Sequence, residues 1–356
     1  MKILAIESSC DETAVAVLEI SASGGKGQTY KVLANFVSSQ IHIHKKYGGV
    51  VPEVAARKHL ENILPLIDKA NIKPKEIDII GVVNGPGLIT SLIVGLETAK
   101  TLAYVWQKPL VPVNHVKAHI LANWLQSGTN KLAKIKFPAL CLVVSGGHTS
   151  LVLLKDKLKF KVIGQTRDDA VGEAFDKVAK LLDLGYPGGP IICERALNAD
   201  STAFNLPRPM INDASFDFSF SGLKTAVRYE LEKIKFSAKG GSAYGGKDKK
   251  TISNMAASFQ QASIDVLISK TIKAAKKLNV KSVLLGGGVS ANKELRAQLA
   301  TAVTELDKVD FYQPDLELTT DNALMVAITA YFEYQDKPYK YKNTWKRIKV
   351  DPNLEI

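Results

Sequence analysis

The sequence predicts an α/β fold in which one structural unit is used twice, giving two similar lobes with a cleft between them. Residues 2–19 and 139–154 share a layout: an apolar strand, a turn of small polar residues, and a second strand rich in β-branched or apolar residues. Each unit continues into a third strand and then into a helical pattern. Because clefts are where ligands bind, we expect the functional site between the lobes.

The remaining elements follow from the spacing of apolar residues and from the Gly- and Pro-containing turns between them. The third strands are expected at residues 30–37 and 160–165. The Gly/Ser/Lys-rich stretch at 239–250 is expected to be a mobile surface loop, and the polar, basic tail after Pro338 to be irregular. The other expected elements are a helix at 52–70, a strand at 77–83, helices at 88–106, 172–182, 188–198, 222–235 and 252–278, a strand at 282–285 and a helix from 292.

Composition limits the class of protein. The 356 residues suffice for two domains, and a hydrophobic content of 46% favours buried cores over disorder. No apolar run reaches the ~18 residues that span a bilayer, so we expect no membrane contact. We expect a strand at residues 1–7 and no signal or transit segment. Cys10, Cys141 and Cys193 are few and far apart, which predicts no disulfide framework and favours the cytoplasm.

The chain is basic. Its 47 Lys and Arg residues against 35 Asp and Glu residues give a formal net charge of +12. This balance favours polyanionic partners, above all nucleic acid. Because Lys far outnumbers Arg, a Lys-rich proteome would give the same charge without such a partner.

His115 and His119 are separated by one helical turn, so both imidazoles can reach one metal ion. The apolar residues 110–113 are expected to form a strand, which places the pair in the first turn of a helix at a strand's C-terminal end, where open α/β folds build their sites. Two partly buried histidines on an ordinary helix remain the alternative. Metalloproteases of the H-E-x-x-H type use the glutamate as a base, and Val116 stands at that position.

Three turns of small residues follow apolar strands, at 8–13, 145–149 and 286–292. Glycines let the backbone approach a ligand, and successive N–H groups in such turns bind anions. A helix that starts at such a turn adds partial positive charge for a phosphate. None is a Walker A or G-x-G-x-x-G motif. An ordinary tight turn explains any one of them, but three in a duplicated framework favour a nucleotide cleft.

The motifs of this chain resemble, in order and spacing, the motif series of the TsaD family from residue 3 to about residue 330. The Ser-Cys-Asp-Glu-Thr form of the first turn is similar to the bacterial branch. The motifs are ESSCDET at 7–13, YGGVVPE at 47–53, GPG at 85–87, HVKAH at 115–119, VSGGHT at 144–149, GEAFDK at 172–177, YPGGP at 186–190, FSFSGLKT at 218–225, GGVSAN at 287–292 and TDN at 320–322.

The resemblance implies the superfold shared by actin and the sugar kinases, with two ribonuclease-H-like lobes and a central ligand cleft. We expect an N-terminal lobe at 1–135, a C-terminal lobe at 136–319, and a helix and tail at 320–356 that pack back onto the first lobe. It also implies an acyltransferase of the N6-L-threonylcarbamoyladenine synthase type. Such an enzyme transfers a threonylcarbamoyl group from L-threonylcarbamoyladenylate to N6 of adenosine 37 in tRNAs that read ANN codons, and releases AMP.

The family's metal ligands fall on His115, His119 and Asp321, which imply one divalent metal, iron first and zinc second. Two histidines and one carboxylate would leave positions open for Lewis-acid chemistry. Asp11 and Glu12 are expected to face the cleft, where they could orient water, metal or the incoming amine. The implied cleft ligands are threonylcarbamoyl-AMP as the substrate and ATP or AMP. Their contacts fall on Val143, Val144, Ser145, Gly146, Gly147, Asp176, Gly189 and Asn292.

Three of these assignments have simple structural alternatives. Asn292 and Asp321 each precede a predicted helix and could equally serve as its N-cap. Without the resemblance, Asp176 would be interpreted as a solvated carboxylate on a helix.

The resemblance implies tRNA as a partner, together with TsaB-like and TsaE-like proteins. A single-stranded anticodon-loop adenosine needs little unpairing energy to enter a site, and the basic surface suits the tRNA backbone. The candidate backbone contacts are Lys45, Lys46, Arg57, Lys58 and Lys224.

Three other functions compete with this reading. A small-molecule kinase of the same superfold would need Mg-ATP and a catalytic aspartate but no HxxxH pair. A non-catalytic scaffold would not need His115, His119 and Asp321 together. A metalloprotease is disfavoured by Val116.

Overall fold

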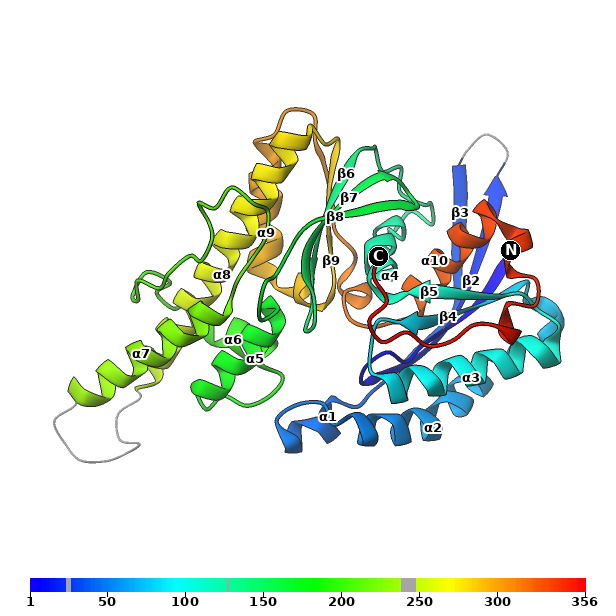
Figure 1. The fold of residues 1–356 in the computed structure, drawn as a ribbon, viewed down its shortest axis with the longest axis horizontal. Helices are drawn as coiled ribbons and strands as arrows, with labels where there is room; N and C mark the ends of the chain where they lie inside the picture. Colours follow the sequence, from blue (N-terminus) through cyan, green and yellow to red (C-terminus); the bar gives the residue numbers. More distant parts are fainter. Residues whose placement is uncertain (24–26, 127, 238–247) are drawn as a thin grey trace.

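The computed structural model describes residues 1–23, 27–126, 128–237 and 248–356. Two five-stranded mixed sheets form its framework, and helices cover them (Figure 1). Both sheets consist of a three-stranded antiparallel meander extended by two parallel strands. The predicted duplicated α/β architecture is therefore confirmed. The predicted loop at 239–250 lies outside the described residues as far as residue 247.

The N-terminal sheet has the strand order β3-β2-β1-β4-β5. Its central strand β1 is buried at five of its six positions. Strands covered on both faces are continuously apolar, which explains the Ile-Leu-Ala-Ile run in this strand. The strands are β1 (Lys2–Glu7), β2 (Glu12–Ser23), β3 (Gly27–Ser39), β4 (Ile79–Gly85) and β5 (Leu110–Asn114).

Alternate side chains of β1 enter two different hydrophobic cores, because successive residues of a strand point to opposite faces. Leu4 and Ile6 pack with residues of α2 and α3 on one face. Ile3 and Ala5 pack with α10 on the other face. The helices concerned are α2 (Pro52–Lys69), α3 (Ile89–Trp106) and α10 (Ala323–Asp336).

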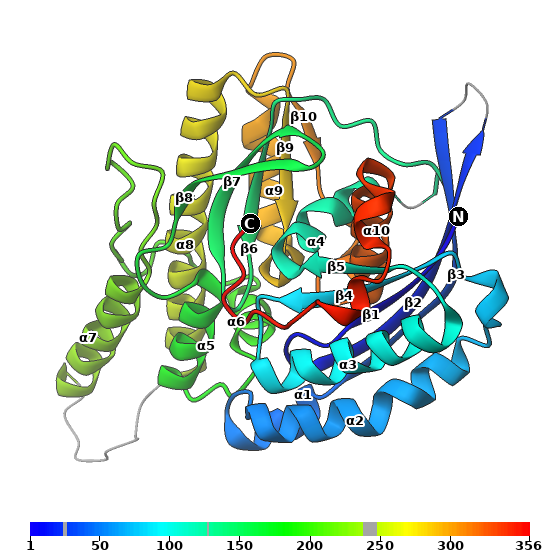
Figure 2. The same ribbon diagram turned by 45° about the vertical axis from the view of Figure 1, so that its right-hand side comes forward.

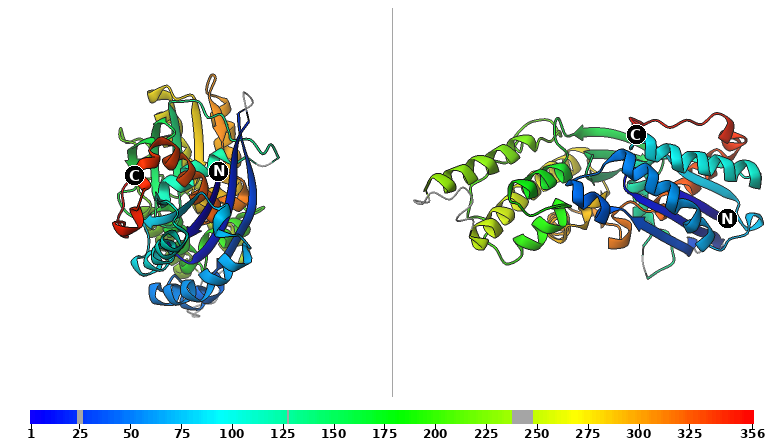
Figure 3. Two further views of the ribbon diagram at one scale, coloured as in Figure 1. Left: turned by 90° about the vertical axis from the view of Figure 1, so that its right-hand side faces the viewer. Right: turned by 90° about the horizontal axis from the view of Figure 1, so that it is seen from below.

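The C-terminal sheet has the matching order β8-β7-β6-β9-β10. Its outer helices form the other end of the molecule (Figure 3, right panel), and a separate core cluster fills the space between them and the sheet. The strands are β6 (Ala139–Val144), β7 (Thr149–Asp156), β8 (Lys159–Gln165), β9 (Ser282–Gly286) and β10 (Asp310–Tyr312). The helices are α5 (Val171–Leu181), α6 (Gly188–Ala196), α7 (Ser221–Ser237), α8 (Lys249–Leu278) and α9 (Lys293–Thr304).

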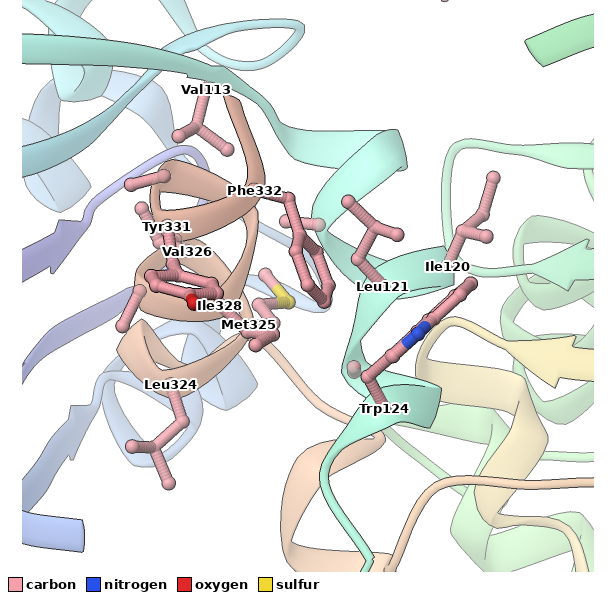
Figure 4. Packing of buried hydrophobic residues seen from close by; sticks show 14 of the residues in the cluster. Val113, Ile120, Leu121, Trp124, Leu324, Met325, Val326, Ile328, Tyr331 and Phe332 are labelled. Atoms are coloured by element: carbon pink, nitrogen blue, oxygen red, sulfur yellow. The ribbon is translucent and has the colours of Figure 1, made fainter. Parts of the chain in front are cut away.

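Two helices join the lobes. Helix α4 (His115–Leu121) follows β5 and contacts β6 and β9 of the other sheet. Helix α10 follows the C-terminal sheet in the chain but packs on the N-terminal sheet, beside α4 (Figure 2). Between α4 and α10, Leu121 and Met325 share one core, and Trp124 meets Phe332 edge to face at 5.8 Å (Figure 4). The same core cluster includes Cys141 and Val143 of β6 and Leu284 of β9, so one hydrophobic core extends across both lobes.

The end of the chain returns to the N-terminal sheet. The backbone N–H of Asp351 donates to the Asn84 carbonyl at 2.8 Å. The Asn114 side-chain amide donates to the carbonyls of Leu354 and Glu355, at 3.2 and 3.1 Å. The expected domain boundaries remain a prediction, although α10 and this tail contact the N-terminal sheet. Among the described helices, none combines the length and apolarity that a membrane span requires.

The predicted helices and strands are confirmed to within a few residues at their ends. The three-residue strand β10 and the short helix α1 (Ile41–His44) were not predicted. The tail after Pro338 was predicted to be irregular, whereas two short 3-10 helices lie within it. The 3-10 helices are η1 (Lys45–Tyr47), η2 (Pro74–Glu76), η3 (Ala122–Trp124), η4 (Gly288–Ala291), η5 (Leu316–Leu318), η6 (Pro338–Tyr341) and η7 (Thr344–Lys346).

Candidate metal and substrate site

His115, His119 and Asp321 meet where α4 begins and where the chain enters α10. His119 Nε2 lies 3.1 Å and His115 Nε2 lies 3.5 Å from the same oxygen, Asp321 Oδ1. One ligand atom from each residue lies within 4.8 Å of the others, so the group could hold a metal ion. The two imidazole rings stand edge to face, with centroids 4.6 Å apart.

Neighbouring caps leave these three side chains free for a ligand. Asn114 is the N-cap of α4, and its Oδ1 accepts from the Lys117 N–H at 3.0 Å. Asn322 is the N-cap of α10, and its Oδ1 accepts from the Met325 N–H at 3.0 Å. The alternative in which Asp321 caps α10 is therefore wrong.

The fully buried carboxylate of Glu7, the last residue of β1, fixes the orientation of His115. Glu7 Oε2 lies 3.1 Å from His115 Nδ1 and accepts a hydrogen bond from its N–H, which leaves Nε2 directed at Asp321. The other oxygen, Oε1, accepts from the Ser9 N–H at 2.6 Å. A carboxylate that orients a histidine in this way is typical of metal sites.

The charges within the cluster perturb each other. Burial lowers the pKa of His115, but the Asp321 and Glu7 carboxylates outweigh it and raise that pKa to about 9. Burial raises the pKa of Asp321, and the two histidines outweigh it, which lowers that pKa to about 2. The buried Nδ1 of His119 has no hydrogen-bond partner among the described residues. A divalent cation would suit His115, His119 and Asp321, because the carboxylate attracts it and imidazole nitrogens serve as its ligands.

The acidic turn, which we define as residues 8–13 and which follows β1 and includes the first two residues of β2, brings Asp11 and Glu12 next to this cluster. Asp11 is buried, and Ser39 Oγ donates to Glu12 Oε1 at 3.2 Å. Burial, with the charges of Asp321 and Asp11, raises the pKa of Glu12 to about 10. The side chain of Glu12 is therefore a protonated carboxyl group at neutral pH when no metal is bound.

The corresponding turn of the C-terminal lobe, residues 145–148, has an open backbone. A Cβ placed on Gly146 or Gly147 would meet no atom within 4 Å. His148 in the same turn is close enough to His115 and His119 for their charges to act on it. Burial, reinforced by these two histidines, lowers the pKa of His148 to about 4 and keeps it neutral. The N–H groups of Ser145 and His148 are bonded within the turn, so among the described residues the turn offers the N–H groups of Gly146 and Gly147 and one neutral imidazole beside the metal cluster.

The other predicted substrate contacts differ in how available they are. The side chains of Val143 and Val144 lie in the hydrophobic cores on opposite faces of β6, so only their backbone could reach a ligand. Gly189 has open space where a Cβ would stand. Asp176 Oδ1 accepts from the Gly188 N–H at 2.7 Å, at the start of α6.

The side chain of Asn292 makes three hydrogen bonds within the C-terminal lobe. Its Oδ1 caps α9 by accepting from the Leu295 N–H at 3.0 Å. Its Nδ2 donates to Gln260 Oε1 at 3.0 Å and to Cys193 Sγ at 3.1 Å. The capping role is confirmed, and the nucleotide contact remains a prediction that is compatible with it, because Oδ1 has a second lone pair.

The candidate tRNA contacts do not form one patch on a single element. Lys45 and Lys46 are exposed in η1. Arg57 and Lys58 lie on α2, where Arg57 pairs with Glu53 at 2.7 Å. Lys224 is half-buried on α7 of the other lobe.

Glu7, His148 and Tyr186 were not predicted from the sequence as members of the site. Glu7 could have been found, because it is a charged residue at the end of an otherwise apolar strand. Tyr186 lies close enough to Asp11 and Asp176, on opposite lobes, for both charges to act on it; burial and these carboxylates raise the pKa of its phenol. Only the folded chain brings these residues together.

Two lobes with this strand order, with ligands gathered where they meet, define the class of protein: the superfold shared by actin and the sugar kinases. The structure is similar to that of T. kodakarensis HypF, with a TM-score of 0.54, 16% identity and coverage of 93% of this chain and 47% of that one. At this identity the likeness concerns the fold alone.

Sequence comparisons identify the family. The family model TsaD, described as tRNA N6-adenosine threonylcarbamoyltransferase, matches residues 31–328. The protein of that name from Thermosipho africanus is 46% identical over 100% of this chain and 100% of its own. The protein of that name from Syntrophomonas wolfei is 46% identical over 95% of this chain and 94% of its own. The chain belongs to the TsaD family of tRNA N6-adenosine threonylcarbamoyltransferases and is a transferase.

Proposed function

We propose that this protein transfers the threonylcarbamoyl group of L-threonylcarbamoyl-AMP to N6 of adenosine 37 in tRNAs that read ANN codons. The observation that carries the proposal is the His115, His119 and Asp321 cluster lying beside the open turn at 145–148. In the reaction, N6 forms a bond to the carbamoyl carbon, the bond from that carbon to the phosphate oxygen breaks, AMP leaves with the electron pair, and N6 loses a proton.

His115, His119 and Asp321 would hold one divalent metal. Two histidines and one carboxylate are the ligand set of non-haem iron sites, which favours iron, with zinc as the second candidate. When bound, the metal would supply Lewis-acid polarisation of a substrate oxygen. Glu7 holds His115 in the orientation that this requires.

The turn at 145–148 and the acidic turn have different tasks in this scheme. The free N–H groups of Gly146 and Gly147 suit the phosphate of the adenylate or negative charge that develops on the carbonyl oxygen. Asp11 faces the cleft as the group that orients the incoming amine. Glu12 lies in the same turn, where burial and the charges of Asp321 and Asp11 raise the pKa of its carboxyl group in the metal-free protein. An aromatic amine is a weak nucleophile, so activation of the carbonyl matters more than removal of the proton.

Gly189 and Asp176 extend the proposed nucleotide site to the start of α6. Asp176 accepts a hydrogen bond from the Gly188 N–H, which fixes the backbone next to Gly189. Its half-buried carboxylate can accept a further hydrogen bond from a hydroxyl group of the ligand. Asn292, Val143 and Val144 would contribute through the frame that they stabilise and through backbone groups. ATP or AMP would occupy the same cleft.

The proposed partners are tRNA and TsaB-like and TsaE-like proteins, in the cytoplasm. The exposed Lys45 and Lys46 suit the tRNA backbone. Leu60 and Leu64, one turn apart on α2, are each more than 60% exposed, and Ile93 on the neighbouring α3 is 43% exposed. We place a protein partner on these apolar side chains, since they would otherwise remain in water.

Nucleoside mass spectrometry of tRNA from cells depleted of the protein tests the proposal. Threonylcarbamoyladenosine should disappear, return with the wild-type gene, and fail to return with His115→Ala. An unchanged level would refute the transferase proposal and move a kinase of the same superfold to the front. Rescue by His115→Ala would retain the reaction and refute the role of the metal.

A further inference from the structure

The acidic turn is held from outside the cleft by a buried histidine that has no part in the proposed chemistry. His59 lies on α2 and is fully buried. Its Nδ1 lies 2.8 Å from Thr13 Oγ1, and its Nε2 lies 3.0 Å from the carbonyl oxygen of Cys10. We propose that His59 is a positioning residue that fixes the acidic turn and, through it, the carboxyl groups of Asp11 and Glu12. This inference rests on the proposed function.

The two hydrogen bonds bracket the two acidic residues. One bond ends on the carbonyl immediately before Asp11, and the other ends on the side chain immediately after Glu12. A shift of the backbone between these two points would therefore strain at least one of the bonds. His59 holds both ends of the segment at once, as a single rigid ring.

The partners determine the tautomer of His59. A carbonyl oxygen only accepts, so Nε2 must carry the proton and donate it to Cys10. Nδ1 then accepts from the Thr13 hydroxyl. Burial lowers the pKa of His59, which agrees with a neutral ring. A neutral ring with both nitrogens bonded has a single orientation, which suits a positioning role.

Two other bonds hold the turn through its backbone. The Gln40 N–H donates to the Asp11 carbonyl at 3.0 Å, and the Leu88 N–H donates to the Ser9 carbonyl at 2.8 Å. His59 adds the contact from α2, which ties the turn to the helix on the outer face of the sheet. The turn is thus held against three neighbouring segments of the N-terminal lobe.

Precise placement of the turn matters because Asp11 and Glu12 lie close to Asp321. The charges of Asp321 and Asp11 both act on the Glu12 carboxyl. A displacement of about 1 Å in groups that position a substrate can lower a rate about 100-fold. Loss of His59 should therefore reduce turnover while leaving the nucleotide turn at 145–148 and the metal ligands in place.

The test compares His59→Leu with His59→Gln. Leu has no polar atoms, whereas the Gln amide has one donor for Cys10 and one acceptor for Thr13. We measure kcat and KM for threonylcarbamoyl-AMP and tRNA with the partner proteins present, together with the affinity for zinc alone. For His59→Leu we expect kcat to fall about 10- to 100-fold with KM and zinc affinity within about twofold, and His59→Gln to recover most of kcat.

Two results would overturn the inference: an unchanged kcat in His59→Leu, or a parallel loss of kcat and zinc affinity that His59→Gln does not relieve. If His59→Leu does not fold, Thr13→Val decides, because it keeps the shape of the side chain and removes only the donor to Nδ1. A wild-type kcat in Thr13→Val would then count against the inference, and a fall of a few-fold would support it. If the wild-type protein itself fails to transfer the group, the proposed function fails, whatever His59 does.

Discussion

The two lobes have the same strand order but equip the same positions with different chemistry. The turn after the first strand of the N-terminal lobe carries Asp11 and Glu12, whereas its counterpart after β6 is Ser-Gly-Gly-His. The last strand pairs that flank the two turns are Glu7 with Ala14 and Val144 with Thr149, so the N-terminal turn is longer by two residues. One lobe therefore offers fixed side chains, and the other offers a free backbone.

The helices that follow the fifth strands repeat this contrast. Helix α4 follows β5 and presents His115 and, one turn later, His119, whereas the segment after β10 presents Asp321 just before α10. Helix α10 packs against the sheet of the opposite lobe, and α4 contacts strands of both sheets. The proposed metal site thus lies where the two lobes meet, and it needs both helices. The difference teaches that one strand order can serve as a common frame, while different residues at equivalent positions provide the proposed metal ligands and the proposed anion-binding turn.

The largest effect is expected from His115→Ala. Polarisation by a metal is worth several kcal/mol, so loss of a ligand should lower the transfer rate roughly 100- to 1,000-fold and abolish stoichiometric metal. Metal analysis and kcat measure this effect. His42→Ala, at an exposed histidine on α1, is the matched control and should behave as the wild type. Full activity of His115→Ala would refute the difference proposed between the lobes, because the N-terminal lobe would then not supply metal ligands that the reaction needs.

Glu7→Gln should weaken zinc binding about 10- to 100-fold, because the histidine loses the carboxylate that orients it. A chelator competition titration measures this change. Val144, the last residue of β6, occupies the position that Glu7 occupies in β1, so Val144→Ala is the control from the other lobe. It should lower the melting temperature without changing zinc affinity. Equal effects of the two substitutions on zinc would show that the lobes are not specialised.

Gly147→Ala should raise the KM for threonylcarbamoyl-AMP about tenfold while changing the free energy of unfolding by less than about 0.5 kcal/mol. The added methyl meets no protein atom within 4 Å, so only a bound ligand would encounter it. Steady-state kinetics and denaturant unfolding give the two quantities. Gly222→Ala, equally open but on α7, is the control. An unchanged KM would remove the anion-binding role from the C-terminal lobe.

The smallest effect is expected from deletion of residues 354–356. This deletion removes the two carbonyls to which the Asn114 side chain donates, at the start of α4, which carries His115 and His119. One or two hydrogen bonds are worth about 1 kcal/mol each, so zinc affinity should fall only a few-fold. Isothermal titration with zinc measures this fall. A fall as large as that of Glu7→Gln would extend the metal site to the tail.

Local features of the chain were predictable from the sequence alone. The apolar strands, the turns that follow them and the repeated order of elements gave the duplicated fold, because these signals depend on neighbours in the chain. The three-residue strand β10 was missed, since so short a segment has no periodicity of its own. Its pairing with β9 comes from the sheet that is already formed.

Long-range contacts decided which site residues act together. Asn292 and Asp321 both precede helices, but Asn292 caps its helix whereas Asn322 takes that role for α10 and leaves Asp321 free. The sequence allowed an N-cap at both residues, beside a nucleotide contact for Asn292 and a metal ligand for Asp321. The packing around each helix start selected between them.

The sequence by itself determined the fold class and the spacing that places His115 and His119 on one face of a helix, because helical periodicity is a local property. Tertiary structure alone brought Asp321 to His119 across 202 positions of the chain, and Glu7 to His115 across 108. The reason is physical: Asp321 arrives only because α10 buries its apolar side chains against the sheet of the other lobe. The site depends on that burial, which spacing along the chain does not encode.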